Sequence, residues 1–235
     1  MIMKLVWLSD DNVFVISKSK TSNKKISDGS ALVQTYTFSK GQWWLANSGK
    51  KFSMTDFFKL DASNCMDCPY SGNQGEGGCY THKFNQYMGF LSMLRSIKDT
   101  QLTPMNQIKF RKAVEMCEGS YVRFGTYGEP SLLDIGLVKA MSSNAKSWTG
   151  YTHQWNKWWA SEYSDYFMAS THNKEETSKA RLKNYRSFIA STTGTEDAVT
   201  CPASAEAGFK SNCASCGLCS GMLGKGNKDI KILEH

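Results

Sequence analysis

Short apolar runs alternate with longer segments of helical periodicity through the middle of the chain. β-branched and aromatic residues predict strands at 31–38, 121–124, 148–151, 166–169 and 187–191. The segments between these runs predict helices at 81–97, 108–116, 132–141 and 173–184. Alternating strands and helices are typical of βαβ units and a mainly parallel sheet. We therefore expect an α/β fold of partial (β/α) barrel type.

The two ends of the chain differ from this middle part. Residues 1–60 hold apolar strand candidates at 5–8, 13–16 and 42–45, which predicts a β-rich segment packed on an α/β core at 61–199. Residues 200–232 are rich in small residues, glycine and cysteine. We expect a bound metal to order this tail, because it has little apolar pattern of its own. Residues 233–235, His235 included, look like a tag remnant.

The length and composition of the chain limit the roles that its cysteines can have. A chain of 235 residues can bury a stabilising core, so its eight cysteines are not needed as covalent staples. The apolar stretch at 5–8 is too short for a secretory signal, and no run approaches the roughly 20 apolar residues of a membrane span. We therefore predict a reducing cytoplasm and no membrane. In that compartment cysteines serve metal binding or catalysis more often than disulfides.

The charge is mildly basic. The formal net charge is +7, and lysines cluster at Lys18, Lys20, Lys24 and Lys25. This is compatible with an acidic partner such as nucleic acid. A solvated basic surface explains it equally, because there is no long Lys/Arg run.

The C-terminal cysteines form the strongest motif. Cys201 precedes Pro202, and the sequence Cys213-Ala-Ser-Cys216-Gly-Leu-Cys219 follows. Spacings of two residues turn successive thiolates toward a common centre, and a distant fourth cysteine before proline matches the ligand pattern of a [4Fe-4S] cluster. Nearby amides can donate hydrogen bonds to the cluster sulfides. Structural zinc with four cysteines is the alternative.

A second group comprises Cys65, Cys68 and Cys79, just before a predicted helix. Glycines at 72, 75, 77 and 78 allow this loop to wrap closely around a ligand. Three cysteines leave one coordination position open, for His82, Cys117, another loop or a substrate. A second cluster and a zinc site both remain open. A core position is expected for Cys117, which stands alone on a helical segment.

Several polar residues follow predicted strands, where α/β folds bind their ligands. Arg123 precedes the turn of residues 125–130 and Glu129 lies within it, His153 follows the strand at 148–151, and His172 follows the strand at 166–169. The histidines are candidates for a base, a ligand or a substrate contact. Buried structural roles are the alternative for each.

These blocks together resemble a family of uncharacterised proteins encoded by tailed bacteriophages. The shared pattern reads CxxCP…GxCY, VRxGxYGxP, TGYTHQW, a strand ending in MAS, and CPAS…CxxCxxC, in the order found here over residues 60–232. The resemblance implies a phage-encoded protein of the host-cell cytoplasm. It implies no particular reaction.

The chain also resembles radical S-adenosylmethionine enzymes. These have a three-cysteine loop after the first strand, a Gly-Glu-Pro-like turn after the second, and often a cysteine-rich tail with an auxiliary cluster. Cys79-Tyr80 and Gly128-Glu129-Pro130 fall in that order here, although the loop spacing departs from the usual CxxxCxxC. The resemblance implies that Tyr80, Gly128 and Glu129 contact S-adenosylmethionine, and that Arg123, His153 and His172 face the substrate.

The functional hypothesis is therefore an iron–sulfur protein, radical-S-adenosylmethionine-like if it is an enzyme, acting on a small molecule. The alternative is a non-catalytic iron–sulfur or zinc protein that binds nucleic acid or a host protein. A purely electron-transferring role is a third hypothesis.

Overall fold

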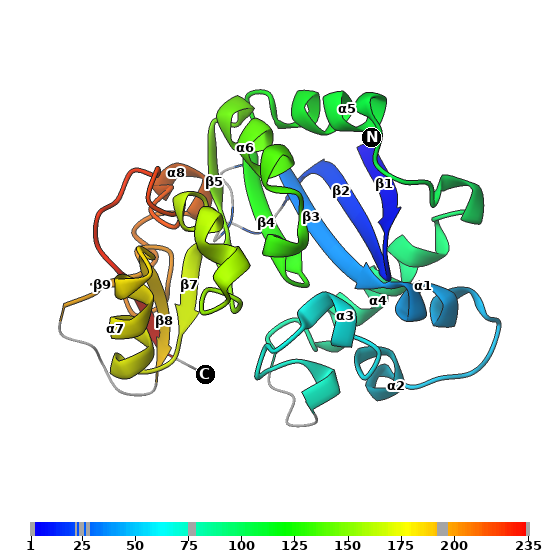
Figure 1. Ribbon diagram of the computed structural model, residues 1–235, viewed down its shortest axis with the longest axis horizontal. Coiled ribbons are helices and arrows are strands. Elements are labelled where there is room, and N and C mark those ends of the chain that lie inside the picture. Colours follow the sequence, from blue (N-terminus) through cyan, green and yellow to red (C-terminus); the bar gives the residue numbers. More distant parts are fainter. Residues whose placement is uncertain are drawn as a thin grey trace.

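The computed structural model describes residues 3–233 except 22, 24, 25, 27, 28, 75–78 and 192–196 (Figure 1). Its strands form two five-stranded sheets. The first has the order β1 (Met3–Ser9), β2 (Asn12–Lys20), β3 (Ala31–Ser39), β4 (Tyr121–Tyr127), β5 (Ser147–Thr149). The second has the order β6 (Tyr151–Thr152), β7 (Met168–Thr171), β8 (Ser187–Ser191), β10 (Ile230–Leu233), β9 (Val199–Thr200).

The second sheet is wholly parallel, and the first sheet is half parallel and half antiparallel. All the neighbours in the second sheet are parallel, as are β3 with β4 and β4 with β5, whereas β1, β2 and β3 pair antiparallel. The predicted mixed α/β class with a mainly parallel sheet is thus confirmed. Gly150 alone separates β5 from β6, and a Cβ there would lie 2.4 Å from the ring of Phe167. The close approach explains why glycine stands at this junction.

The helices flank these sheets. They are α1 (Lys40–Asn47), α2 (Met54–Phe58), α3 (Ala62–Cys65), α4 (Phe84–Arg95), α5 (Gln107–Cys117), α6 (Ile135–Asn144), α7 (Lys174–Leu182) and α8 (Cys213–Cys216). Short 3-10 helices are η1 (Gly72–Gln74), η2 (Asp99–Gln101), η3 (Pro130–Leu132) and η4 (Trp158–Asp165). Within the described residues, no helix is long and apolar enough to span a bilayer.

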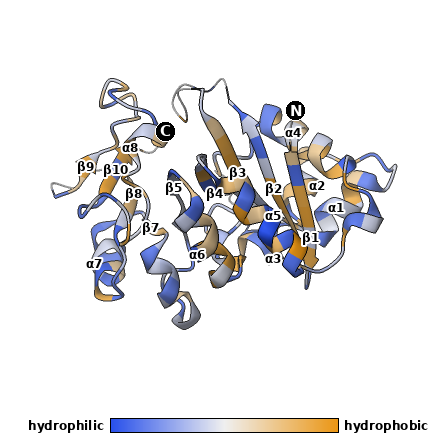
Figure 2. Cartoon of the chain, turned by 90° about the horizontal axis from the view of Figure 1, so that it is seen from above, coloured by the Kyte–Doolittle hydropathy of each residue, from blue (hydrophilic) through white to orange (hydrophobic). Residues whose placement is uncertain are grey.

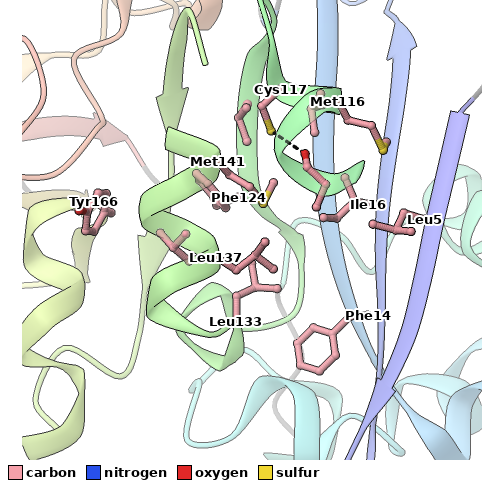
Figure 3. Close-up of a cluster of buried hydrophobic side chains, with 14 of the residues drawn as sticks. Leu5, Phe14, Ile16, Met116, Cys117, Phe124, Leu133, Leu137, Met141 and Tyr166 are labelled. Atoms are coloured by element: carbon pink, nitrogen blue, oxygen red, sulfur yellow. Dashed lines mark hydrogen bonds between the residues drawn. The ribbon is translucent and has the colours of Figure 1, made fainter. Parts of the chain in front are cut away.

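Two apolar clusters cover the first sheet on opposite faces. One lies between the strands and helices α5 and α6, and includes Phe14, Phe124 and Leu137 (Figure 3). The other joins Tyr36 and Phe38 to residues of α1, α2 and α4. In Figure 2 apolar residues concentrate along β1, whereas α7 is largely hydrophilic. Burial on both faces explains the apolar character of these strands.

One predicted strand is wrong. Residues 42–45 lie in helix α1, which begins with a capping box at Ser39. The Ser39 hydroxyl accepts a hydrogen bond from the Gln42 amide at 3.0 Å, and the Gln42 side chain accepts one from the Ser39 amide at 3.1 Å. This reciprocal pair satisfies two amides that a helix start otherwise leaves free, and so favours the helix over a strand.

The tail has more regular structure than its sequence indicates. Strand β10 lies between β8 and β9, and Leu233, which was set apart as a tag remnant, pairs with Ser191. Buried Arg186 donates to the carbonyl groups of Leu218 and Gly221 at 2.9 and 3.0 Å. Protein contacts therefore contribute to the order of the tail. Lys18 and Lys20 lie on β2, while Lys24 and Lys25 fall outside the described residues.

Candidate functional site

The predicted site residues lie at the carboxyl ends of parallel strands. The Cys65–Cys79 segment follows β3, Glu129 follows β4, His153 follows β6 and His172 follows β7. β3 and β4 share one edge of the first sheet, and β6 and β7 share one edge of the second, and α/β proteins place their ligands at such edges.

Hydrogen bonds between these loops show that they meet. The Glu129 amide donates to the Asn64 carbonyl at 2.7 Å, beside Cys65. The Glu129 carboxylate accepts a hydrogen bond from the His153 amide at 3.1 Å. Tyr70, from the cysteine segment, places its hydroxyl 3.2 Å from Nδ1 of His172. Four loops that are far apart in the sequence therefore form one connected site.

A buried carboxylate shapes the N-terminal cysteine segment. Asp61 accepts hydrogen bonds from the amides of Gly72 and Asn73 at 2.8 and 2.9 Å. These contacts fold the segment back over the end of α2, where a Cβ on Gly72 would lie 2.6 Å from the Phe58 carbonyl oxygen. Glycine at 72 is thus required by a close approach, whereas Gly75, Gly77 and Gly78 fall outside the described residues.

Cys65, Cys68 and Cys79 act on one another electrostatically. Burial raises the pKa of the Cys68 thiol to about 12, and the neighbouring Cys79 adds to the shift. Burial likewise raises the pKa of Cys65, with Asp61, Cys68 and Cys79 contributing. Thiolates bind metals, and a bound cation removes the mutual repulsion that opposes their formation. The three thiols are therefore suited to a metal and poorly suited to carrying charge without one.

Of the two residues proposed for the open position, His82 lies beside the cysteine segment and Cys117 lies in the core. The His82 ring stacks on Phe58, with ring centroids 3.9 Å apart, and its Nε2 lies 3.9 Å from Oδ2 of Asp61. Cys117 is fully buried in the core, where its thiol donates to the Ala113 carbonyl at 3.3 Å (Figure 3). The expected core role of Cys117 is confirmed.

Glu129 is held tightly inside the protein. Its carboxylate is buried and accepts hydrogen bonds from the Ser131 amide and hydroxyl at 3.0 and 2.6 Å, besides the His153 amide. Burial raises its pKa, while the hydrogen bonds from Ser131, Thr152 and His153 oppose that shift. Because a carboxylate offers about four acceptor positions, most of its capacity is used within the protein. Glu129 therefore fixes the loop after β6 against the turn after β4.

The two histidines form a stacked pair under Tyr70. Their ring centroids are 5.7 Å apart at 11°, and the Tyr70 ring meets His172 edge-on at 5.0 Å. Within the described residues, Nε2 of His172 is buried without a hydrogen-bond partner. Tyr70 was missed by the sequence analysis, although an aromatic residue two positions after Cys68 was the available signal.

The His153 ring is neutral at physiological pH. Burial, reinforced by the nearby His172, lowers its pKa to about 4. An unfolded histidine titrates near 6.5, so between these values the unfolded chain binds the additional proton. The contribution of the His153 ring to the free energy of unfolding is therefore fully present above pH 6.5, and it is lost as the pH falls toward 4.

We expect this titration to be visible in the free energy of unfolding. His153→Gln should remove a pH-dependent contribution of at most about 3 kcal/mol between pH 6.5 and 4. Urea unfolding of both proteins across this range measures it. If the free energy of unfolding changed with pH in the same way in both proteins, the pKa of His153 would not be lowered and the prediction would be wrong.

Arg123 and Tyr80 form a pair beside the cysteine segment. Arg123, on β4, donates from Nη2 to the Tyr80 hydroxyl at 2.9 Å, and its guanidinium lies 5.8 Å from the Tyr80 ring centroid. Tyr80 directly follows Cys79 and is 53% exposed. Gly128, with φ of +77°, packs against the Thr37 and Asn64 carbonyl groups. The predicted cofactor residues thus surround the cysteine segment.

The four C-terminal cysteines line one cavity of about 20 Å³. Thr149, Tyr151 and Ile230 contribute to its wall, and no carboxylate or imidazole does so among the described residues. Burial raises the pKa of Cys219 to about 12, and Cys201, Cys213 and Cys216 add to the shift. A donor set of thiolates alone suits an iron–sulfur cluster or zinc and does not suit hard cations such as magnesium.

The thiols converge without forming a finished metal site. Over the described ranges, no group of three or more His, Cys, Asp or Glu side chains is placed so that it would hold a metal ion. A metal could bind at either site only if the cysteine side chains turned toward a common centre.

Comparisons with known proteins identify no relative of this chain. No family model, no curated protein and no solved structure matches the chain. Function is therefore inferred from the residues of the site and their chemistry.

Proposed function

We propose that the chain is an iron–sulfur protein, and that its N-terminal cysteine group makes it a radical-S-adenosylmethionine-like enzyme acting on a small molecule. The observation that carries the proposal is the convergence of Cys201, Cys213, Cys216 and Cys219 on one cavity with no carboxylate or imidazole in its wall among the described residues. Their CxxCxxC spacing with a distant Cys-Pro favours a cubane cluster. This tail would be ordered in part by its cluster.

The second cysteine group supports an enzyme. Cys65, Cys68 and Cys79 leave a coordination position open, and the turn at Gly128 and Glu129 lies against their segment. A cluster held there would supply an electron and an open iron for S-adenosylmethionine. The parallel strands β3 to β8 would form a partial barrel around this place, with its loops at one edge.

In this proposal each residue around the cysteine segment has its own role. Backbone groups of the Gly128–Glu129 turn would hold the amino group of S-adenosylmethionine, because the Glu129 carboxylate is largely engaged with Ser131 and His153. The His153 and His172 rings and the Arg123 guanidinium would face the substrate. Tyr70 would orient His172 through its hydroxyl.

A non-catalytic metal protein is the second candidate. Four thiols around one cavity also fit structural zinc. The net charge of +7 would then serve contact with nucleic acid or with a host protein in the cytoplasm of a phage-infected cell.

Anaerobic reconstitution followed by iron and sulfide counting tests the proposal. We expect roughly four to eight iron atoms per chain with matching acid-labile sulfide. EPR spectra of the reduced protein should change when S-adenosylmethionine is added. Zinc without sulfide would refute the iron–sulfur assignment, and unchanged spectra would refute the enzymatic one. Salt-dependent binding of nucleic acid would favour the second candidate.

A further inference from the structure

Within the part of the chain that the structure describes, Arg123 carries a positive charge without an acidic partner. The ion pairs of the described residues involve Asp61, Asp67, Glu175 and Asp229, and none of them includes Arg123. A guanidinium has five N–H donors, and the Tyr80 hydroxyl takes one of them. Arginines that are partly withdrawn from water are normally paired with a carboxylate or phosphate.

The neighbours of the guanidinium do not compensate for its charge. The groups that act on it electrostatically are Tyr80, Tyr121, Tyr151 and Cys213, in decreasing order. Phenols are neutral at pH 7, and burial raises the pKa of Tyr151 further. The Tyr121 hydroxyl is already engaged with Thr149 Oγ1 at 2.6 Å. Over the described residues, the surroundings of Arg123 therefore combine aromatic side chains with one cation that has no acidic partner.

The position of Arg123 is that of a substrate anchor. On β4 it pairs with Gln34 of β3 on one side and Thr149 of β5 on the other, so polar groups flank it in the sheet. Tyr80 connects it to Cys79, while Cys213 belongs to the C-terminal cavity. Arg123 is half-buried and its partner Tyr80 is 53% exposed, so the pair lies at the border between the interior and solvent.

We propose that Arg123, with Tyr80, binds an oxyanion group of the substrate, a phosphate or a carboxylate, between the two cysteine groups. This inference rests on the proposed function and names its substrate class. The planar fork of arginine binds two oxygens of such a group at once, which a lysine cannot do. Tyr80 positions the fork through its hydroxyl and its ring. The hydrogen bond to Tyr80 links the guanidinium to the residue that follows Cys79.

Chemical modification of the wild-type protein is the first test. Phenylglyoxal, which reacts with accessible guanidinium groups, is applied with inorganic phosphate, with acetate, or with chloride at equal ionic strength, and peptides are mapped by mass spectrometry. We expect Arg123 to react and to be protected at least fivefold by phosphate or acetate relative to chloride. Stronger protection by one of the two assigns a phosphate or a carboxylate group. An unreactive Arg123, or equal protection by chloride, would overturn the proposal.

Variants supply the second test. Phosphate affinity, measured by titration calorimetry, should fall about ten- to a hundredfold in Arg123→Gln, which removes a charge-assisted pair. Arg123→Lys should recover part of the loss. Arg111→Gln, which removes an exposed arginine on α5, is the matched control and should bind phosphate as the wild type does.

Iron and sulfide counts separate this inference from the proposed function. Normal counts in Arg123→Gln together with weakened phosphate binding support the anchor. If Arg123→Gln lost iron and kept its phosphate affinity, Arg123 would instead neutralise the charge of a cluster. That result would overturn the proposal that it anchors the substrate. Absence of iron and sulfide from wild type with phosphate binding at Arg123 intact would refute the iron–sulfur function alone. Should Arg123→Gln fail to fold, the wild-type protection experiment still decides.

Discussion

Replacing Cys216 with serine is expected to abolish metal binding at the C-terminal site and to loosen the tail. A serine hydroxyl stays protonated at neutral pH and is a poor ligand for iron or zinc. Because binding free energy at a site that orders its own segment is folding free energy, we expect the free energy of unfolding to fall by roughly 3 kcal/mol or more. Iron and sulfide counts and anaerobic urea unfolding of the reconstituted protein measure both effects.

Cys117→Ala is the matched control for this prediction. Cys117 is buried in the first apolar cluster, away from both cysteine groups, so its truncation should cost about 1–2 kcal/mol and leave the iron content unchanged. The prediction fails if Cys216→Ser retains the iron and sulfide of the wild type.

Gly128→Ala is expected to damage the N-terminal site severely. Gly128 has φ of +77°, and a Cβ there would lie 2.5 Å from the Thr37 carbonyl oxygen and 3.1 Å from that of Asn64. Both obstacles are backbone atoms, so the turn must move away from β3 and from the cysteine segment. We expect a loss of about 3 kcal/mol or more in unfolding free energy, together with loss of iron from the N-terminal group.

Gly119→Ala is a control that separates the steric clash of an added Cβ from the cost of a positive φ. Gly119 has a similar φ of +62°, and a Cβ added there meets nothing within 4 Å. This variant should cost only about 1–2 kcal/mol and should keep its iron. Urea unfolding and iron counting compare the two variants directly. Equal losses in both would contradict the role assigned to the packing of Gly128 against Asn64.

The fold class was predictable because its signals are local. The strand at 121–124 and the helices at 108–116 and 173–184 follow from periodicity and correspond to β4, α5 and α7. Helix α1 was not predicted, because Gln-Trp-Trp-Leu resembles a strand until the Ser39 capping box is seen. Strand β10 was not predicted either, because its place between β8 and β9 depends on long-range pairing.

The sequence by itself determined which residues are candidates for the chemistry. The cysteine spacings and the polar residues after strands name Cys65 to Cys79, Cys201 to Cys219, His153 and His172, because spacing and strand ends are properties of the chain. Only the tertiary structure decided how they are used. It added Tyr70 beside His172, engaged the Glu129 carboxylate with His153, and left Arg123 among tyrosines without an acid within the described residues. Such neighbours come from segments that are distant in the sequence, so only packing brings them together.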